Sequence, residues 1–269
     1  MPTGWISRHP VAAFLAVAFG WTVTWDVVFT LFDLWTVMPV SIPRVWGPAI
    51  AAVVVAWAGE TPVRAWLAQV LDWRVNPLLF IAAVVIPIAI TNVQPVVEGL
   101  GGSVGYDPPA AIYYLPVWIA LNMVLLGGTE ELGWRGVLQP RWQQRVSVFT
   151  AGLAVGVAWW AWHLPLWFVP GTELVFEPGA FVTYTVFILG ASTVLGGLVN
   201  LADGSVLPAM LMHASVNAGA FLAATGGVLD GSILVPLVVG AGLWWMLAAG
   251  LVYVYGWSMA PGEPVEPVA

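Results

Sequence analysis

The sequence contains no cysteine and no lysine, and charged residues make up only 8% of its 269 positions. The absence of cysteine excludes disulfide bridges, thiolate metal sites and a cysteine nucleophile. A soluble domain carries about 25% charged residues, so this chain lacks the charge to cover a water-facing surface. Hydrophobic residues amount to 60%, which predicts an integral membrane protein. The net charge of −7 argues against binding to nucleic acid.

Apolar runs separated by proline, glycine and charge predict an all-α fold, a polytopic bundle of about eight transmembrane helices in one membrane domain over residues 1–269. Each crossing needs about 20 residues. The segment Thr61–Val75 is either an interfacial helix or an ordinary loop, and the proline-rich tail 261–269 is expected to be disordered. The expected spans are Pro10–Leu34, Trp46–Gly59, Pro77–Val93, Ala110–Leu132, Val148–Phe168, Gly179–Leu201, Leu207–Thr225 and Ser232–Trp257.

The arginines predict how the bundle is oriented in the cell membrane. If both termini are cytoplasmic, six of the seven arginines fall on the cytoplasmic side, as is typical of multi-pass proteins. Arg44, between the first two spans, is the exception. The six are Arg8, Arg64, Arg74, Arg135, Arg141 and Arg145.

The adjacent acids Glu130 and Glu131 follow an apolar run and begin the string Glu-Glu-Leu-Gly-Trp-Arg-Gly. A charge at the centre of a membrane helix costs about 2.5–3.5 kcal/mol, so a chain that keeps such residues is usually using them. Arg135 is four residues after Glu131 and can pair with it on one helix face. Glu130 is rotated by about 100° from Glu131, which leaves its carboxylate to face something else.

Two of the three histidines also fall inside predicted spans. His163 is one helical turn after Trp159, and His213 is one turn before Asn217. Each residue alone could simply hydrogen-bond a neighbouring helix, and the acid–arginine pair could be purely structural. Taken together, a free carboxylate, two histidines and an amide from three spans predict one convergent site, because unpaired polar groups in hydrocarbon cost several kcal/mol.

These residue types suit the hydrolysis of an amide bond. A carboxylate and a histidine can position and deprotonate a water, while a histidine and an asparagine can donate hydrogen bonds to the oxyanion that forms. Zinc bound by His163, His213 and Glu130, with a fourth position open for water, is the alternative interpretation. The signatures His-Glu-x-x-His and Gly-x-Ser-x-Gly are absent from the sequence.

The motifs resemble those of the CPBP intramembrane proteases, which include the CAAX prenyl endopeptidases and the bacterial Abi proteins. That family has Glu-Glu-x-x-x-Arg, an aromatic residue four before a histidine, and His-x-x-x-Asn, in this order. Tryptophan at 159 stands where phenylalanine is usual, which predicts altered packing near the histidine. The resemblance covers about residues 126–220. The matching positions are Glu130, Glu131, Arg135, Trp159, His163, His213 and Asn217.

The resemblance implies an eight-helix intramembrane endopeptidase of the glutamate type, with a catalytic core over about residues 110–225. In that family, residues matching Glu130 and His163 activate a water, and those matching His213 and Asn217 form the oxyanion hole. Glu131, Arg135 and Trp159 would support them.

The resemblance also sets expectations about cofactors and partners. No cofactor is expected, with zinc as the alternative. The expected partners are membrane lipids and a membrane-associated hydrophobic peptide, prenylated or not. Two other classes stay open: a non-catalytic scaffold or bacteriocin-immunity protein of the same fold, and a transporter or proton relay that uses the same carboxylates.

Overall fold

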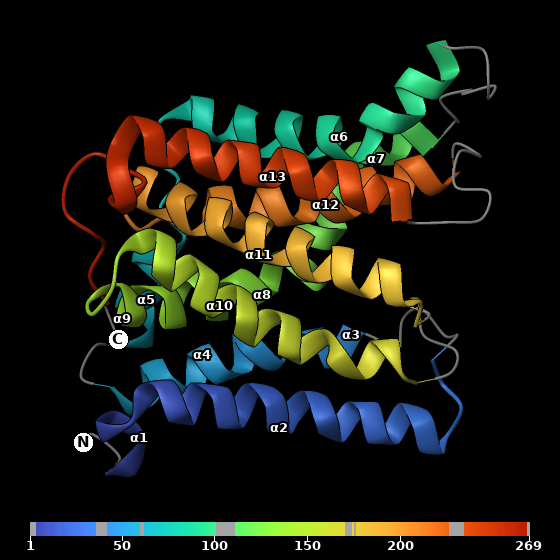
Figure 1. Ribbon diagram of the computed structural model, residues 1–269. Helices are drawn as coiled ribbons and strands as arrows, with labels where there is room; N and C mark the ends of the chain where they lie inside the picture. The colour runs from blue at the N-terminus through green and yellow to red at the C-terminus, as the bar shows by residue number, and fades with distance from the viewer. Residues whose placement is uncertain are drawn as a thin grey trace.

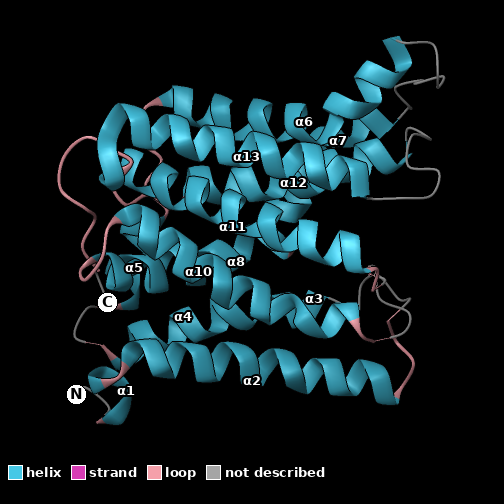
Figure 2. Cartoon of the chain, in the orientation of Figure 1, coloured by secondary structure: helices cyan, strands magenta, loops and turns pink. Residues whose placement is uncertain are grey.

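The computed structural model describes residues 4–35, 42–59, 62–100, 111–169, 174, 176–225 and 234–267. Within these ranges every regular element is a helix, and none is a strand (Figure 2). The long helices run alongside one another as a bundle (Figure 1). The elements are α1 Trp5–Arg8, α2 Pro10–Leu31, α3 Ile42–Val45, α4 Gly47–Ala58, α5 Val63–Val70, α6 Pro77–Leu100, α7 Ala111–Leu125, α8 Gly127–Gly133, η2 Trp134–Leu138, α9 Gln139–Gln143, α10 Val148–His163, η3 Leu164–Trp167, α11 Pro178–Leu201, α12 Leu207–Thr225, α13 Leu234–Tyr255 and η4 Gly256–Ser258.

A helix lies at each of the eight predicted spans, so the predicted fold class, a polytopic helical membrane protein, is confirmed. In the part of the chain that the structure describes, four stretches are long and apolar enough to cross a bilayer. They are Pro10–Leu31, Ile112–Gln143, Pro178–Leu201 and Leu237–Ser258. Shorter apolar helices cover Gly47–Ala58, Pro77–Val93 and Leu207–Ala223.

The fourth span is longer than the predicted end at Leu132. Its helical path continues through α8, the π-helical turn η2 and α9, and the apolar stretch ends at Gln143. Arg135 is therefore fully buried in the bundle, where its charge had predicted a loop. The guanidinium lies beside Glu131 and donates to Ser192 Oγ at 3.1 Å, so the charge is compensated inside. The two adjacent carboxylates consequently stand within the bundle and not at its edge.

Helix α8 occupies the centre of the bundle, in contact with α4 on one side and α12 on another. Gly133 permits the first of these contacts, because a Cβ there would collide with the Pro48 carbonyl of α4. Small residues that let backbones approach closely are typical of helix packing in membranes. The central position of α8 places its acidic pair where side chains of several helices can reach it.

The segment expected to be an interfacial helix or a loop contains helix α5. Trp66 on α5 is fully buried and donates from Nε1 to the Gly136 carbonyl at 3.1 Å. One face of α5 therefore packs on the bundle beside η2.

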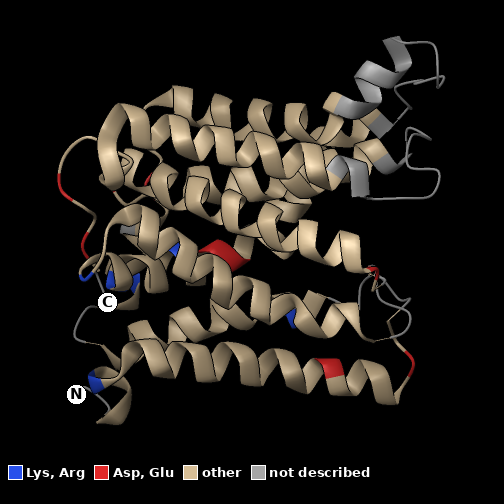
Figure 3. Ribbon diagram, viewed as in Figure 1, with Lys and Arg blue, Asp and Glu red and all other residues tan. Residues whose placement is uncertain are grey.

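Both marked chain ends lie at the same end of the bundle (Figure 1), and most of the basic residues gather there (Figure 3). Within the described part of the tail that was expected to be disordered, Val265 is hydrogen-bonded to the bundle. The Val265 carbonyl accepts a hydrogen bond from Gln143 Nε2 at 2.6 Å, and its N–H donates to Asn200 Oδ1 at 3.0 Å. Residues 268–269 lie outside the described ranges.

Candidate active site

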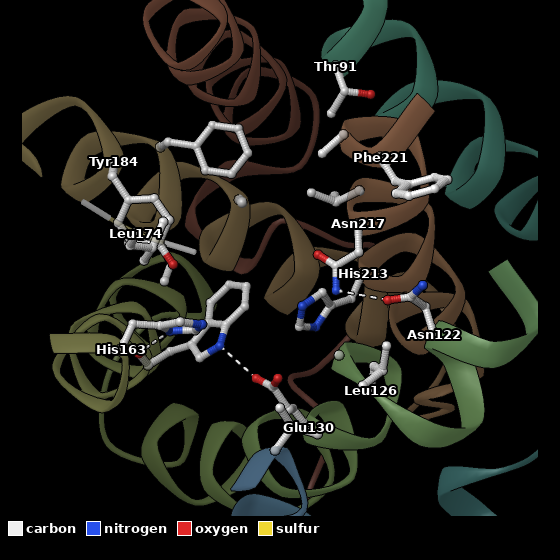
Figure 4. Close-up of a pocket in the computed structure, with 18 of the residues that line it drawn as sticks. Thr91, Asn122, Leu126, Glu130, His163, Leu174, Tyr184, His213, Asn217 and Phe221 are labelled. Carbon is white, nitrogen blue, oxygen red and sulfur yellow. Dashed lines mark hydrogen bonds between the residues drawn. The ribbon is translucent and has the colours of Figure 1, made fainter. Parts of the chain in front are cut away.

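A cavity of about 790 Å³ lies inside the bundle, and most of its wall is apolar. The four residues expected to be catalytic, Glu130, His163, His213 and Asn217, all line it. They come from α8, α10 and α12, and Figure 4 shows them around one space. The four side chains that were predicted to converge therefore do line one cavity.

Glu130 is only 3% exposed and faces this cavity. Its Oε2 accepts a hydrogen bond from Trp159 Nε1 at 2.9 Å (Figure 4). Phenylalanine, the usual residue at position 159 in the resembling family, could not make this bond because it has no donor. The tryptophan therefore does more than alter packing: it fixes one oxygen of the carboxylate.

His163 ends α10 and is oriented by its own helix. Its Nδ1 lies 2.9 Å from the Trp159 carbonyl oxygen. Because a carbonyl can only accept, Nδ1 carries the proton, and Nε2 of the neutral ring carries a lone pair. A group with that lone pair can accept a hydrogen bond from a water or take its proton.

Glu131 is fully buried and contacts two other site residues. Its Oε2 lies 3.3 Å from Arg135 Nε, an ion pair that is not aligned as a hydrogen bond. Its Oε1 lies 2.7 Å from His213 Nδ1. The predicted ion pair is thus present, and the contact with His213 is new. No sequence pattern indicates it, since the two residues are 82 positions apart.

His213 and Asn217 aim their side chains at the same point above Gly127. A Cβ on this glycine would lie 2.5 Å from His213 Nε2 and 2.6 Å from Asn217 Nδ2. Glycine therefore leaves open a position within hydrogen-bonding reach of both nitrogens. An oxygen atom could occupy that position and accept from both.

Asn122 on α7 is a site residue that the sequence patterns did not single out. Its Nδ2 donates to the Trp118 carbonyl at 2.9 Å, and its Oδ1 accepts from Asn217 Nδ2 at 3.3 Å. These two hydrogen bonds fix the orientation of the Asn217 amide. Its donor atom Nδ2 therefore faces the position above Gly127. The available signal was an amide within the apolar run 111–126.

The arrangement of the side chains in the described ranges bears on the metal alternative. No group of three or more His, Asp or Glu side chains there is arranged to hold a metal ion. His213 Nδ1 is engaged with Glu131, and His163 Nδ1 with a backbone carbonyl. Any zinc would thus have to bind through the Nε2 atoms.

Comparison with known proteins points to the same family as the motifs. Residues 112–219 match the family model described as Rce1-like, the type II CAAX prenyl endopeptidases. A stretch of 57 residues is 46% identical to CAAX prenyl protease 2 of Methanococcus maripaludis, and it covers 21% of this chain and 20% of that protein. The matches confirm the resemblance and support a membrane protease of the CAAX type in general terms.

Proposed function

We propose that this protein is an intramembrane endopeptidase of the glutamate type. One observation carries the proposal: a carboxylate, two histidines and an amide from three helices line one cavity. The name of the matching relative supports a membrane-associated peptide with a prenylated C-terminal Cys-a-a-X sequence as substrate. The apolar wall of the cavity suits a hydrophobic substrate.

In the proposed reaction, Glu130 takes a proton from a water that also bonds to His163 Nε2. The resulting hydroxide oxygen attacks the scissile carbonyl carbon, and the carbonyl oxygen becomes an oxyanion. When the C–N bond breaks, the departing nitrogen receives the proton from Glu130. Trp159 holds one oxygen of the carboxylate throughout, by the bond to Oε2.

The oxyanion would sit above Gly127, between His213 Nε2 and Asn217 Nδ2. Because His213 Nδ1 faces the Glu131 carboxylate, Nε2 can donate only when the ring carries both protons. We therefore assign His213 as an imidazolium, with Glu131 as its counter-ion. Two donors aimed at developing charge in a site away from bulk water form an oxyanion hole.

The direct test is cleavage by the purified full-length protein in lipid vesicles. A prenylated peptide ending in Cys-a-a-X is incubated with the protein, and the products are identified by mass spectrometry. Release of the C-terminal peptide is the expected result. A folded protein that cleaves neither the prenylated peptide nor its unprenylated counterpart would favour a scaffold or immunity role.

Replacing Asn122 by leucine should lower kcat about 10-fold and leave KM unchanged. Removal of an oxyanion donor itself costs about 10²–10³-fold, and this change only frees the Asn217 amide to rotate. The oxyanion exists only after attack, so substrate binding should not respond. Steady-state kinetics check the prediction.

The matched control is Asn92→Leu, a buried amide that binds the Gly219 carbonyl and does not line the cavity. If Asn92→Leu and Asn122→Leu reduced kcat equally, a specific positioning role for Asn122 would be wrong.

Zinc dependence gives a separate prediction. The purified protein should contain far less than one equivalent of zinc, and turnover should persist in a strong chelator. Metal analysis and activity are measured on the same sample. Stoichiometric zinc that is lost together with activity, and restores it when added back, would assign His163 and His213 as ligands.

The orientation of the bundle is also a proposal. The gathering of arginines at the end where both termini lie supports a cytoplasmic location for that end (Figure 3).

A further inference from the structure

Arg44 is the arginine that the charge pattern leaves unexplained, and it lines the cavity of the candidate active site. It belongs to α3, which lies away from the basic end marked by α5, α9 and the termini (Figure 1). The side chain is buried. Among the described residues of the cavity wall it is the only arginine. A cation inside a membrane protein is expensive and usually functional.

The guanidinium of Arg44 is held in a fixed orientation. Its Nε donates to Asp26 Oδ1 at 2.6 Å, and its Nη2 donates to the Trp162 carbonyl at 3.1 Å. It also lies 4.3 Å from the centre of the Trp162 ring, whose Nε1 donates to Thr22 at 2.7 Å. These contacts use two of the three guanidinium nitrogens. They also hold the guanidinium against Trp162, the residue that directly precedes His163.

The pair with Asp26 uses only part of what the Arg44 guanidinium can donate. Arginine and carboxylate frequently pair through two parallel bonds. Here only Oδ1 is used, and Asp26 Oδ2 is buried without a hydrogen-bond partner in the described part of the chain. A buried ion pair is also weak evidence for a stabilising role. A guanidinium fixed at the wall of a cavity, with its planar fork only partly used, suits a second carboxylate.

We propose that Arg44 binds the free C-terminal carboxylate of the peptide substrate. The proposal rests on the proposed function, because a Cys-a-a-X sequence is by definition at a C-terminus. Three extended residues span about 10 Å, a length that a cavity of about 790 Å³ can accommodate. Glu130 and His163 line the same cavity as Arg44. A carboxylate on Arg44 would therefore set which peptide bond lies at the catalytic water.

The test compares two prenylated peptides that differ only at the C-terminus, one a free acid and the other an amide. With wild-type protein, the amide should show a KM about 10–100-fold higher, since a charge-assisted contact is lost. Arg44→Gln should raise the KM of the acid to that of the amide and leave the amide unchanged. Arg44→Lys should retain part of the preference. Arg74→Gln, an exposed arginine outside the cavity, is the matched control and should behave as wild type.

Arg44→Gln leaves Asp26 unpaired, so the double variant Arg44→Gln/Asp26→Asn is measured in parallel, with a thermal melt for each protein. Equal acid and amide KM values in wild type, or an acid preference that survives in either folded variant, would overturn the proposal.

Binding of the same peptides, labelled with a fluorophore, separates this proposal from the proteolytic function. If wild type cleaves neither peptide yet binds the acid more tightly through Arg44, the carboxylate site stands and the proposed protease activity fails. If it cleaves both peptides with equal KM, the activity stands and the carboxylate site fails.

Discussion

Replacing Glu130 by glutamine is expected to reduce peptide cleavage by about 10²–10⁴-fold, the usual contribution of general acid–base catalysis. The amide oxygen of glutamine can still accept the Trp159 N–H bond, so local geometry should persist. The amide cannot take the proton of the attacking water. The loss should therefore appear in kcat, with the KM and the melting temperature close to those of wild type.

The His163→Ala variant should also lose most of its activity, because the water would lose its second partner. Glu263→Gln serves as the control: it removes an exposed carboxylate from the tail and should leave cleavage unchanged. Rates are measured by single-turnover kinetics on the prenylated peptide. Full activity in Glu130→Gln would remove this residue from the reaction, and full activity in His163→Ala would do the same for the histidine.

The helices could be predicted from the sequence because the hydrophobic pattern is strong and local. Most apolar runs have a helix of nearly the predicted extent, although α6 continues past the predicted end at Val93 to Leu100. The largest difference is at the fourth span, where Arg135 suggested a loop. A charge indicates water only if no partner is available inside, and here Glu131 and Ser192 provide compensation. The contact with Ser192 depends on the packing of α11, which a local pattern cannot reveal.

Parts of the site followed from helical spacing, and other parts did not. The Glu131–Arg135 pair is one turn apart and could be expected. The hydrogen bonds between His213 and Glu131 and between Trp159 and Glu130 join different helices, so they depend on how the bundle assembles. Asn122 carried only a weak signal, an amide in an apolar run.

Replacing Glu131 by alanine should lower both stability and activity, because this carboxylate contacts Arg135 and His213 at once. Removing one partner of a buried ion pair costs about 3–5 kcal/mol, since the other charge is left without compensation. Activity should fall because the His213 ring loses the group that orients it and supports its second proton. A thermal melt and a cleavage assay on the same preparation give both quantities.

Two further variants separate the structural contribution of Glu131 from its effect on His213. Glu131→Gln keeps an oxygen that can accept from His213 Nδ1, but it removes the negative charge. It should therefore hold the ring in place yet support the imidazolium poorly, so kcat should fall further than in Arg135→Ala, while the loss of stability should be similar because the buried ion pair is broken in both variants. Arg135→Ala removes the other partner and should lower stability by a similar amount to Glu131→Ala, while it leaves the bond to His213. If Glu131→Ala kept wild-type stability and lost all turnover, the carboxylate would act directly on the substrate or water, and its assignment as a positioning residue would be wrong.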